Sequence, residues 1–107
     1  MDTVQQIIDA NKDDYDFGFR FMENSPMENS PAVGDMLPRS NVWEGDEPTD
    51  VELPGTCAWD TLSSAEKYAQ YSHEYIVLIG GVLVQSGDLA GEIIIDDAQV
   101  FAVWKWR

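Results

Sequence analysis

The most regular stretch of the sequence is YDFGFRFM, residues 15–22. Its side chains alternate with a period of two, so the aromatic rings at positions 15, 17, 19 and 21 share one face of an extended chain. This pattern predicts a β-strand whose aromatic face belongs to the core. Arg20 then projects from the opposite face, where a well-anchored strand would hold its guanidinium rigidly.

The rest of the chain predicts short elements of both kinds. Helices are expected over residues 3–11, where apolar residues follow helical spacing, and from Ser63 to about residue 72, where Ser63 and Glu66 form a capping box. Strands are expected at residues 56–59, 75–80, 82–85, 92–96 and 99–106. This order favours an α+β fold, a small mixed or antiparallel sheet with two short helices, in a single domain over residues 1–107.

A long acidic segment, about residues 23–55, separates the first strand from the second helix. It is rich in proline and glycine, which end regular elements and favour turns. Loops of this length in a compact domain are usually functional or mobile. The composition therefore predicts an irregular loop here.

The charge balance is strongly acidic: 20 Asp and Glu against 6 Lys and Arg give a formal net charge of −14. A field of this sign repels phosphate backbones and anionic lipid headgroups, which excludes direct binding to nucleic acid or to an anionic membrane. It favours protein partners with a basic surface. A solubilising role alone accounts for the same acids.

The location expected from the sequence is the cytoplasm, either of the protein's own cell or of an infected host. The first residues, MDTV, lack the basic and apolar regions of a signal peptide. The longest apolar run, Ile76–Val84, is too short to cross a bilayer.

Metal and thiol chemistry have little support in the sequence. Cys57 and His73 are the single cysteine and the single histidine, and paired acids such as Asp96-Asp97 lack the spacing of a calcium loop. No metal site is therefore expected. A nucleophilic Cys57–His73 pair stays open, although a lone cysteine beside alanine and tryptophan is more often a small core residue.

Three features that follow one another along the chain carry a family resemblance. They are Arg20 on its early strand, the segment Thr56-Cys57-Ala58 before a helix, and Glu92-Ile93-Ile94-Ile95, which opens a late apolar strand after Gly91. In these features the chain resembles the ADP-ribosyltransferase-like superfamily. The resemblance covers about residues 15–106, and the glutamate motif is its best match. A second Glu or Gln commonly lies two residues before the catalytic glutamate in that family, and here the position is Ala90.

The resemblance implies an NAD-binding domain that transfers ADP-ribose to a protein or another acceptor. Arg20 would pair with the NAD diphosphate, because a guanidinium fork matches phosphate oxygens. Thr56 would order the nicotinamide side of the site. Glu92 would be the catalytic residue, accepting a hydrogen bond from the nicotinamide ribose and stabilising positive charge as nicotinamide leaves.

The charge supports a different hypothesis, a non-enzymatic inhibitor. Carboxylates spaced like phosphates can occupy the nucleic-acid groove of a basic protein, as do the small anti-restriction or anti-CRISPR inhibitors of phages and other mobile elements. Such a protein needs no active site. The candidate acidic surface consists of Asp13, Asp14, Asp16, Glu44, Asp46, Glu47, Asp50 and Glu52.

Overall fold

The computed structural model describes residues 2–22, 32–68 and 75–106. Two helices and six strands follow one another along these residues: α1 Asp2–Asn11, β1 Asp16–Met22, β2 Asn41–Glu44, β3 Glu47–Glu52, β4 Thr56–Trp59, α2 Leu62–Lys67, β5 Tyr75–Ser86 and β6 Glu92–Lys105. All pairs between these strands are antiparallel. The α+β class and the antiparallel sheet expected from the sequence are therefore confirmed. None of the helices in these ranges is long and apolar enough to span a membrane.

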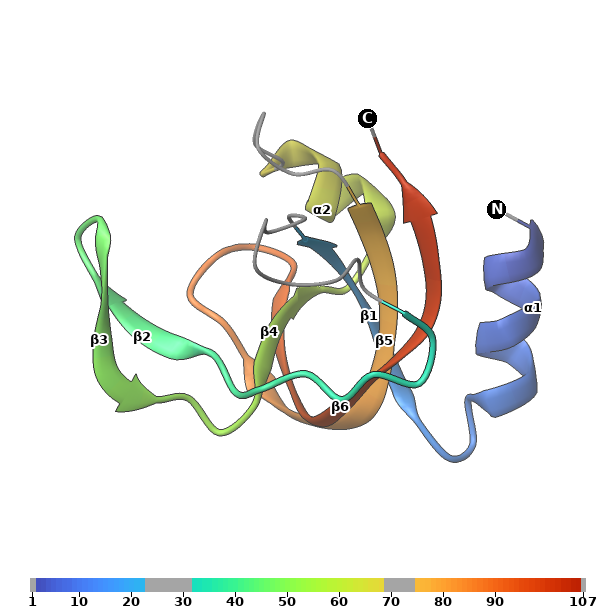
Figure 1. The fold of residues 1–107 in the computed structure, drawn as a ribbon, viewed down its shortest axis with the longest axis horizontal. Coiled ribbons are helices and arrows are strands. Elements are labelled where there is room, and N and C mark those ends of the chain that lie inside the picture. Colours follow the sequence, from blue (N-terminus) through green and yellow to red (C-terminus); the bar gives the residue numbers. More distant parts are fainter. Residues whose placement is uncertain (1, 23–31, 69–74, 107) are drawn as a thin grey trace.

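Four strands close into a small barrel in the order β1-β4-β6-β5, and β2 and β3 form a separate hairpin beside it (Figure 1). The barrel is joined unevenly. β1 pairs with β5 through seven residue pairs, from Asp16–Gly81 to Met22–Tyr75. The register between β1 and β4 is a single pair, Phe19–Trp59. The barrel therefore opens between β1 and β4 on the carboxyl-terminal side of Phe19.

The two long strands β5 and β6 correct the expectation of four shorter ones. Gly80-Gly81 and Asp96-Asp97 do not end strands; both pairs lie where the β5–β6 register shifts and the hairpin bends around the barrel. Asp97 has a positive φ of 52°, and a Cβ on Gly81 would lie 2.3 Å from the Asp96 carbonyl oxygen. The bend therefore needs a residue without a side chain at position 81, a role of glycine at barrel corners.

The core has two layers, one inside the barrel and one outside it. All four barrel strands surround the inner layer, which contains Ala58, Val77, Ile79, Ile95, Ala98 and Val100. The outer layer lies between the barrel and the helices and contains Val4, Phe19, Phe21, Ala65, Ile76 and Leu78. The aromatic face of β1 is thus core, as predicted, but it faces the helices. The opposite face of β1 points into the barrel, where a Cβ on Gly18 would lie 2.9 Å from the Ala58 Cβ.

Helix α2 begins one residue earlier than expected because a different residue caps it. Thr61 is the N-cap, and its hydroxyl oxygen accepts a hydrogen bond from the Ser64 amide at 3.1 Å. The predicted capping box of Ser63 and Glu66 is therefore wrong. The helix is described to Lys67, and its expected end near residue 72 lies outside the described residues.

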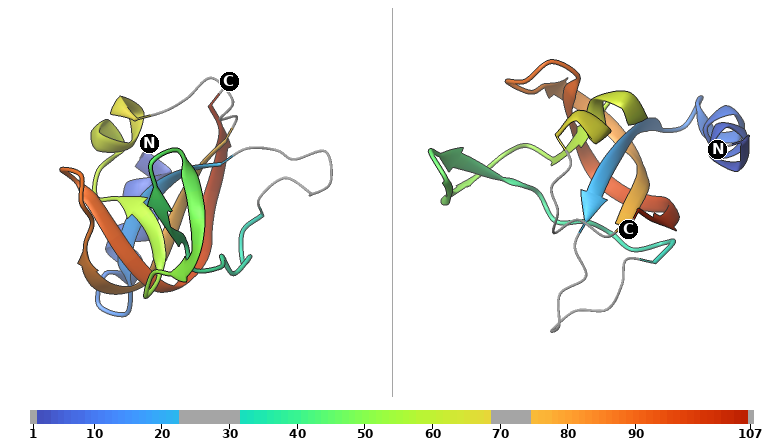
Figure 2. Two further views of the ribbon diagram at one scale, coloured as in Figure 1. Left: turned by 90° about the vertical axis from the view of Figure 1, so that its left-hand side faces the viewer. Right: turned by 90° about the horizontal axis from the view of Figure 1, so that it is seen from above.

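The predicted irregular loop over residues 23–55 contains a β-hairpin, β2–β3. Gly45, with φ +64°, makes its turn. Asn41 Nδ2 donates to the Thr49 carbonyl and Thr49 Oγ1 donates to the Val42 carbonyl, both at 2.7 Å. The sequence did not predict this hairpin because proline and acidic residues disfavour strands. The two cross-strand hydrogen bonds stabilise it. Figures 1 and 2 show that it projects from the barrel. Residues 23–31 of the predicted loop lie outside the described part of the chain.

Candidate functional site: a pocket at the opening between β1 and β4

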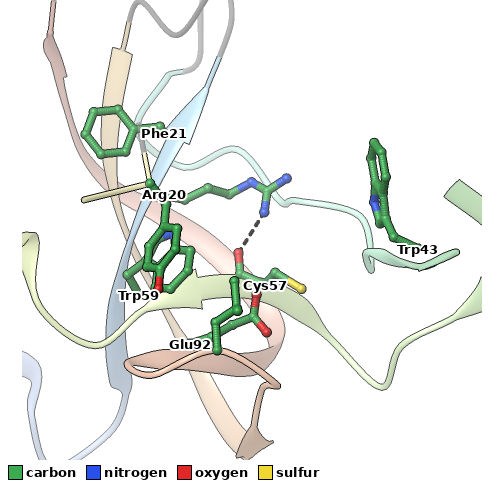
Figure 3. Close-up of a pocket in the computed structure, with 8 residues that line it drawn as sticks. Arg20, Phe21, Trp43, Cys57, Trp59 and Glu92 are labelled. Carbon is green, nitrogen blue, oxygen red and sulfur yellow. Dashed lines mark hydrogen bonds between the residues drawn. The ribbon is translucent and has the colours of Figure 1, made fainter. Parts of the chain in front are cut away.

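A pocket of about 470 Å³ lies at the opening between β1 and β4 (Figure 3). Arg20 and Phe21 come from β1, Cys57 and Trp59 from β4, and the remaining lining residues are Trp43, Tyr68, Leu89 and Glu92. Its volume is within the range of small-molecule sites, roughly 300–1,000 Å³. Two residues predicted to act together, Arg20 and Glu92, therefore line one pocket although 72 positions separate them in the chain.

Arg20 occupies the opening itself. Its Nη1 donates a hydrogen bond to the Cys57 carbonyl at 2.7 Å, so the guanidinium takes the place of a strand amide where β1 no longer pairs with β4. Burial lowers the pKa of the guanidinium from its ordinary value, the Cys57 thiol acting weakly in the other direction. An arginine nevertheless stays charged in proteins. In the described part of the chain no carboxylate lies within 4.0 Å of it; the ion pair there joins Arg39 to Asp96.

Among residues 2–22, 32–68 and 75–106, the Arg20 cation therefore has only part of its hydrogen-bonding capacity satisfied. A guanidinium has five N–H donors, and the hydrogen bond described for it uses one. A half-buried cation with free donors, placed in a pocket, is a position for an anionic ligand group.

Glu92 is held by the turn that precedes β6. Its register partner across the sheet is Trp59. The Asp88 amide donates to Glu92 Oε1 at 3.0 Å, and the Gly87 amide donates to the Glu92 carbonyl at 2.8 Å. A Cβ on Gly87 would overlap the Glu92 carboxylate. The turn therefore fixes the direction of this half-buried side chain.

Thr56, the third predicted site residue, does not line this pocket. It is 2% exposed, and its hydroxyl donates to the Pro38 carbonyl at 2.8 Å. It lines a neighbouring pocket of about 410 Å³, shared with Arg20 and with residues 35–40. Because Thr56 and Cys57 alternate along β4, they point to opposite faces, and Cys57 is the one beside Glu92.

Aromatic rings form two walls of the Arg20–Glu92 pocket, and the sequence did not assign them to a site. Trp59 and Tyr68 stack with ring centroids 4.5 Å apart and planes 7° from parallel. Across the pocket stands Trp43 of the β2–β3 hairpin (Figure 3), which is 63% exposed. The sequence feature that could have indicated this part of the site is Trp43 itself, an isolated tryptophan within an acidic, proline-rich segment.

Cys57 lines the pocket but has the wrong electrostatics for a nucleophile. Burial raises the pKa of its thiol; a hydrogen bond with Ser40 opposes this and the Glu92 carboxylate adds to it. A thiol with a raised pKa is inert at neutral pH. His73 lies outside the described residues. Within the described ranges no group of three or more His, Cys, Asp or Glu could hold a metal ion.

The predicted acidic surface is divided between two places. Glu44, Asp46, Glu47, Asp50 and Glu52 are exposed on the β2–β3 hairpin or its turn. Asp13, Asp14 and Asp16 lie at the α1–β1 connection, at the other end of the longest axis (Figures 1 and 2). Asp16 also accepts a hydrogen bond from the Leu83 amide at 2.8 Å. The eight carboxylates therefore form two separate groups.

No protein-family model, curated protein or solved structure matches this chain. The pocket brings together a guanidinium that has no carboxylate partner among the described residues, one oriented carboxylate and stacked aromatic rings, around a space of small-molecule size. That combination suits a ligand with an anionic group and a flat ring.

Proposed function

We propose that the pocket binds NAD and that the protein is an ADP-ribosyltransferase-like domain. The observation that carries the proposal is the placement of Arg20 and Glu92 in one pocket. The strands that bear the three motifs are also neighbours, in the order β1-β4-β6. A shared NAD site requires the three motifs to lie close together in space, and their order along the chain does not by itself bring them together.

Each residue has a role that follows from its surroundings. The Arg20 guanidinium binds the diphosphate with N–H groups that have no acceptor among the described residues, because a guanidinium fork pairs two phosphate oxygens at once. Glu92, oriented by the Asp88 amide, accepts a hydrogen bond from the nicotinamide ribose. Thr56 supports the site indirectly, since its hydrogen bond to Pro38 ties the chain before β2 to β4.

The proposed reaction breaks the bond between the ribose C1′ and the nicotinamide nitrogen, which keeps the bonding electron pair. Positive charge develops on the ribose, and the Glu92 carboxylate stabilises it more than it stabilises the ground state. An acceptor nucleophile then bonds to C1′ and loses its proton. Ala90, two residues before Glu92, is exposed and has no polar group to orient an acceptor. The acceptor must therefore bring its own orienting contacts.

Thermal shift and calorimetry with NAD test binding, and chromatography of released nicotinamide tests chemistry. NAD at 100 times its Kd should add about 2.7 kcal/mol to the free energy of unfolding. Arg20→Met should abolish binding. Glu92→Gln should bind NAD and slow nicotinamide release roughly 100-fold or more. Lys105→Ala, which removes a cation exposed at the end of β6, is the matched control and should behave as wild type. Unchanged melting in millimolar NAD would refute the proposal.

The acidic hairpin supports a second, non-enzymatic candidate, an inhibitor that binds a basic nucleic-acid-processing protein. Five exposed carboxylates lie on this hairpin and its turn, and the hairpin projects from the barrel (Figure 2). Neutralising them to Asn and Gln should abolish capture of such a partner and leave NAD binding intact. Neutralising Asp13 and Asp14 is the control. The affinity of the hairpin for such a partner should fall steeply as the salt concentration rises. An affinity that does not change with salt would exclude the inhibitor hypothesis.

A further inference from the structure

The second half of β5 has an open edge. The first half of this strand pairs with β1 on one side and with β6 on the other, whereas residues 82–86 pair, among the described strands, with β6 alone. The register with β1 ends at Gly81 because the chain before β1 turns toward α1 (Figure 1). In that turn the amides of Asp14 and Tyr15 both donate to the Asn11 carbonyl at 3.0 Å. Over residues 82–86, β5 is therefore an edge strand.

This edge is apolar and exposed. Its sequence, VLVQS, contains no charged residue and no proline, and Val82, Leu83 and Val84 are 57%, 48% and 44% exposed. Proteins usually protect a sheet edge with charges, prolines or short strands, because unpaired backbone groups favour pairing with another strand. Here the Leu83 amide donates to Asp16 Oδ2 at 2.8 Å. The amide of Leu83 thus points to the open edge, and a side chain rather than a strand satisfies it.

A pocket of about 380 Å³ lies beside this edge, and Leu83 lines it. Its other walls come from α1, from β1 and from Ile93 of β6. The charged residues of the lining are Asp16, Asp60 and Lys12, so carboxylates outnumber ammonium groups by two to one. All three are exposed, and Lys12 can neutralise only one of the two carboxylates. A side chain with an apolar stem and a cationic end matches this pocket.

The charge of the chain decides which occupant suits the edge. A second copy would bring a formal charge of −14 against the same charge, and like charges across an interface disfavour association. A basic segment is attracted both by the overall field and by the carboxylates of the pocket. An extended peptide gains main-chain hydrogen bonds from a sheet edge and side-chain contacts from an adjoining pocket. The occupant that fits is an extended basic peptide.

We propose that residues 82–86 of β5 are a docking edge for an extended basic segment of a partner protein. The segment pairs with β5 in line with β1, and one of its lysine or arginine side chains enters the pocket beside Asp16 and Asp60. The Asp16 carboxylate releases the Leu83 amide to the incoming backbone and pairs with the cation instead. The described lining of this pocket shares no residue with the Arg20–Glu92 pocket, so the docking edge is independent of NAD binding.

Fluorescence anisotropy of a labelled decapeptide of alternating lysine and valine, titrated with the full chain, tests the docking edge. Two matched peptides separate the sources of affinity. One has glutamate in place of lysine, and the other keeps lysine but is N-methylated at successive central amides, which blocks pairing along both of its edges. The unmodified lysine peptide should bind at least about tenfold more tightly than either.

Substitutions at Leu83 locate the binding. Leu83→Pro removes the amide that faces Asp16 and leaves the β5–β6 ladder intact, so it should weaken peptide binding at least about tenfold. Leu83→Lys places a positive charge at the edge and should weaken it at least about fivefold, which keeps the test decisive if the proline variant unfolds. Val51→Lys is the matched control and should bind as wild type, because it changes the net charge equally at a residue outside this pocket. Far-UV circular dichroism reports whether each variant is folded.

Each contrary outcome overturns a different part of the proposal. Equal binding of the N-methylated peptide would show attraction by charge without strand pairing. Equal loss in Leu83→Lys and Val51→Lys would exclude the β5 edge as the location. A wild-type dimer in sedimentation that Leu83→Lys dissociates, and Val51→Lys does not, would identify the occupant as a second copy. Arg20→Met should leave peptide binding unchanged, so failure of the docking edge and failure of the NAD proposal are distinguishable.

Discussion

Replacing Arg20 by methionine distinguishes between two roles for this residue, binding a ligand and stabilising the fold. Methionine retains the apolar length of the side chain and removes the charge and its donors. If Arg20 serves the fold, the protein should lose stability when its hydrogen bond to Cys57 is removed. If it serves a ligand, the unliganded protein carries a poorly compensated cation, and removing it should help the fold.

The magnitude follows from two opposed contributions. The lost hydrogen bond from a charged donor to the Cys57 carbonyl contributes about 1.5–3 kcal/mol. Burial of the guanidinium, which lowers its pKa, costs several kcal/mol in ion desolvation, and no carboxylate among the described residues within 4.0 Å offsets it. The second contribution is larger. We therefore expect Arg20→Met to raise the free energy of unfolding by about 1–2 kcal/mol.

Urea denaturation followed by tryptophan fluorescence measures this difference, with calorimetric titration of NAD on the same samples. The control is Arg39→Met, which breaks an exposed ion pair with Asp96 at 3.3 Å and should change stability by less than about 1 kcal/mol. A stabilised Arg20→Met that no longer binds NAD is the expected result. A loss of more than about 1 kcal/mol would show instead that the hydrogen bond of Arg20 across the β1–β4 opening stabilises the fold, and would refute a ligand-binding role as the reason for this residue.

Three further predictions concern the pocket, the barrel bend and the second helix. Folding raises the pKa of the Cys57 thiol above its ordinary value of 9.0, so this group contributes stability below that pH and the contribution is lost as the pH rises through the folded pKa. In urea titrations, the wild-type free energy of unfolding should therefore fall more steeply above about pH 9 than that of Cys57→Ala. Gly81→Ala should lower the free energy of unfolding by at least about 2 kcal/mol, because the new Cβ would meet a backbone oxygen. Gly34→Ala, at φ +96° with open space around it, should lower it by about 1 kcal/mol. Equal urea midpoints for the two variants would contradict the role of Gly81 in the bend. Thr61→Ala should lower the free energy of unfolding by about 1 kcal/mol, because it removes the N-cap of α2. If it lowers the melting temperature no more than Ser63→Ala does, Thr61 is not the cap.

Strand β1 shows how far periodicity reaches. The alternation over residues 15–22 predicted a strand, its aromatic core face and the isolation of Arg20 on the other face, because side-chain direction in a strand is a local property. The same locality predicted β4 at residues 56–59. It could not say that the face opposite the aromatics lies inside a barrel, since that depends on which strands close around it.

The errors have a common cause in contacts between distant residues. Gly80-Gly81 looks like a break because glycine weakens a strand locally, yet the close approach of Asp96 requires a glycine within a continuous β5. The β2–β3 hairpin was missed because Pro48 and its acids oppose a strand in isolation, whereas hydrogen bonds of Asn41 and Thr49 across the hairpin hold it.

The sequence by itself determined the α+β class, the strongly acidic character and the candidates Arg20 and Glu92, because charge and side-chain type need no knowledge of the fold. The tertiary structure alone decided that these two side chains share a pocket and that Thr56 lies beyond it on the other face of β4. It also decided that the acidic residues form two groups and that Trp43 faces Trp59 across the pocket. These are relations between strands, and strand pairing, set by the burial of both core layers, has no local signature in the chain.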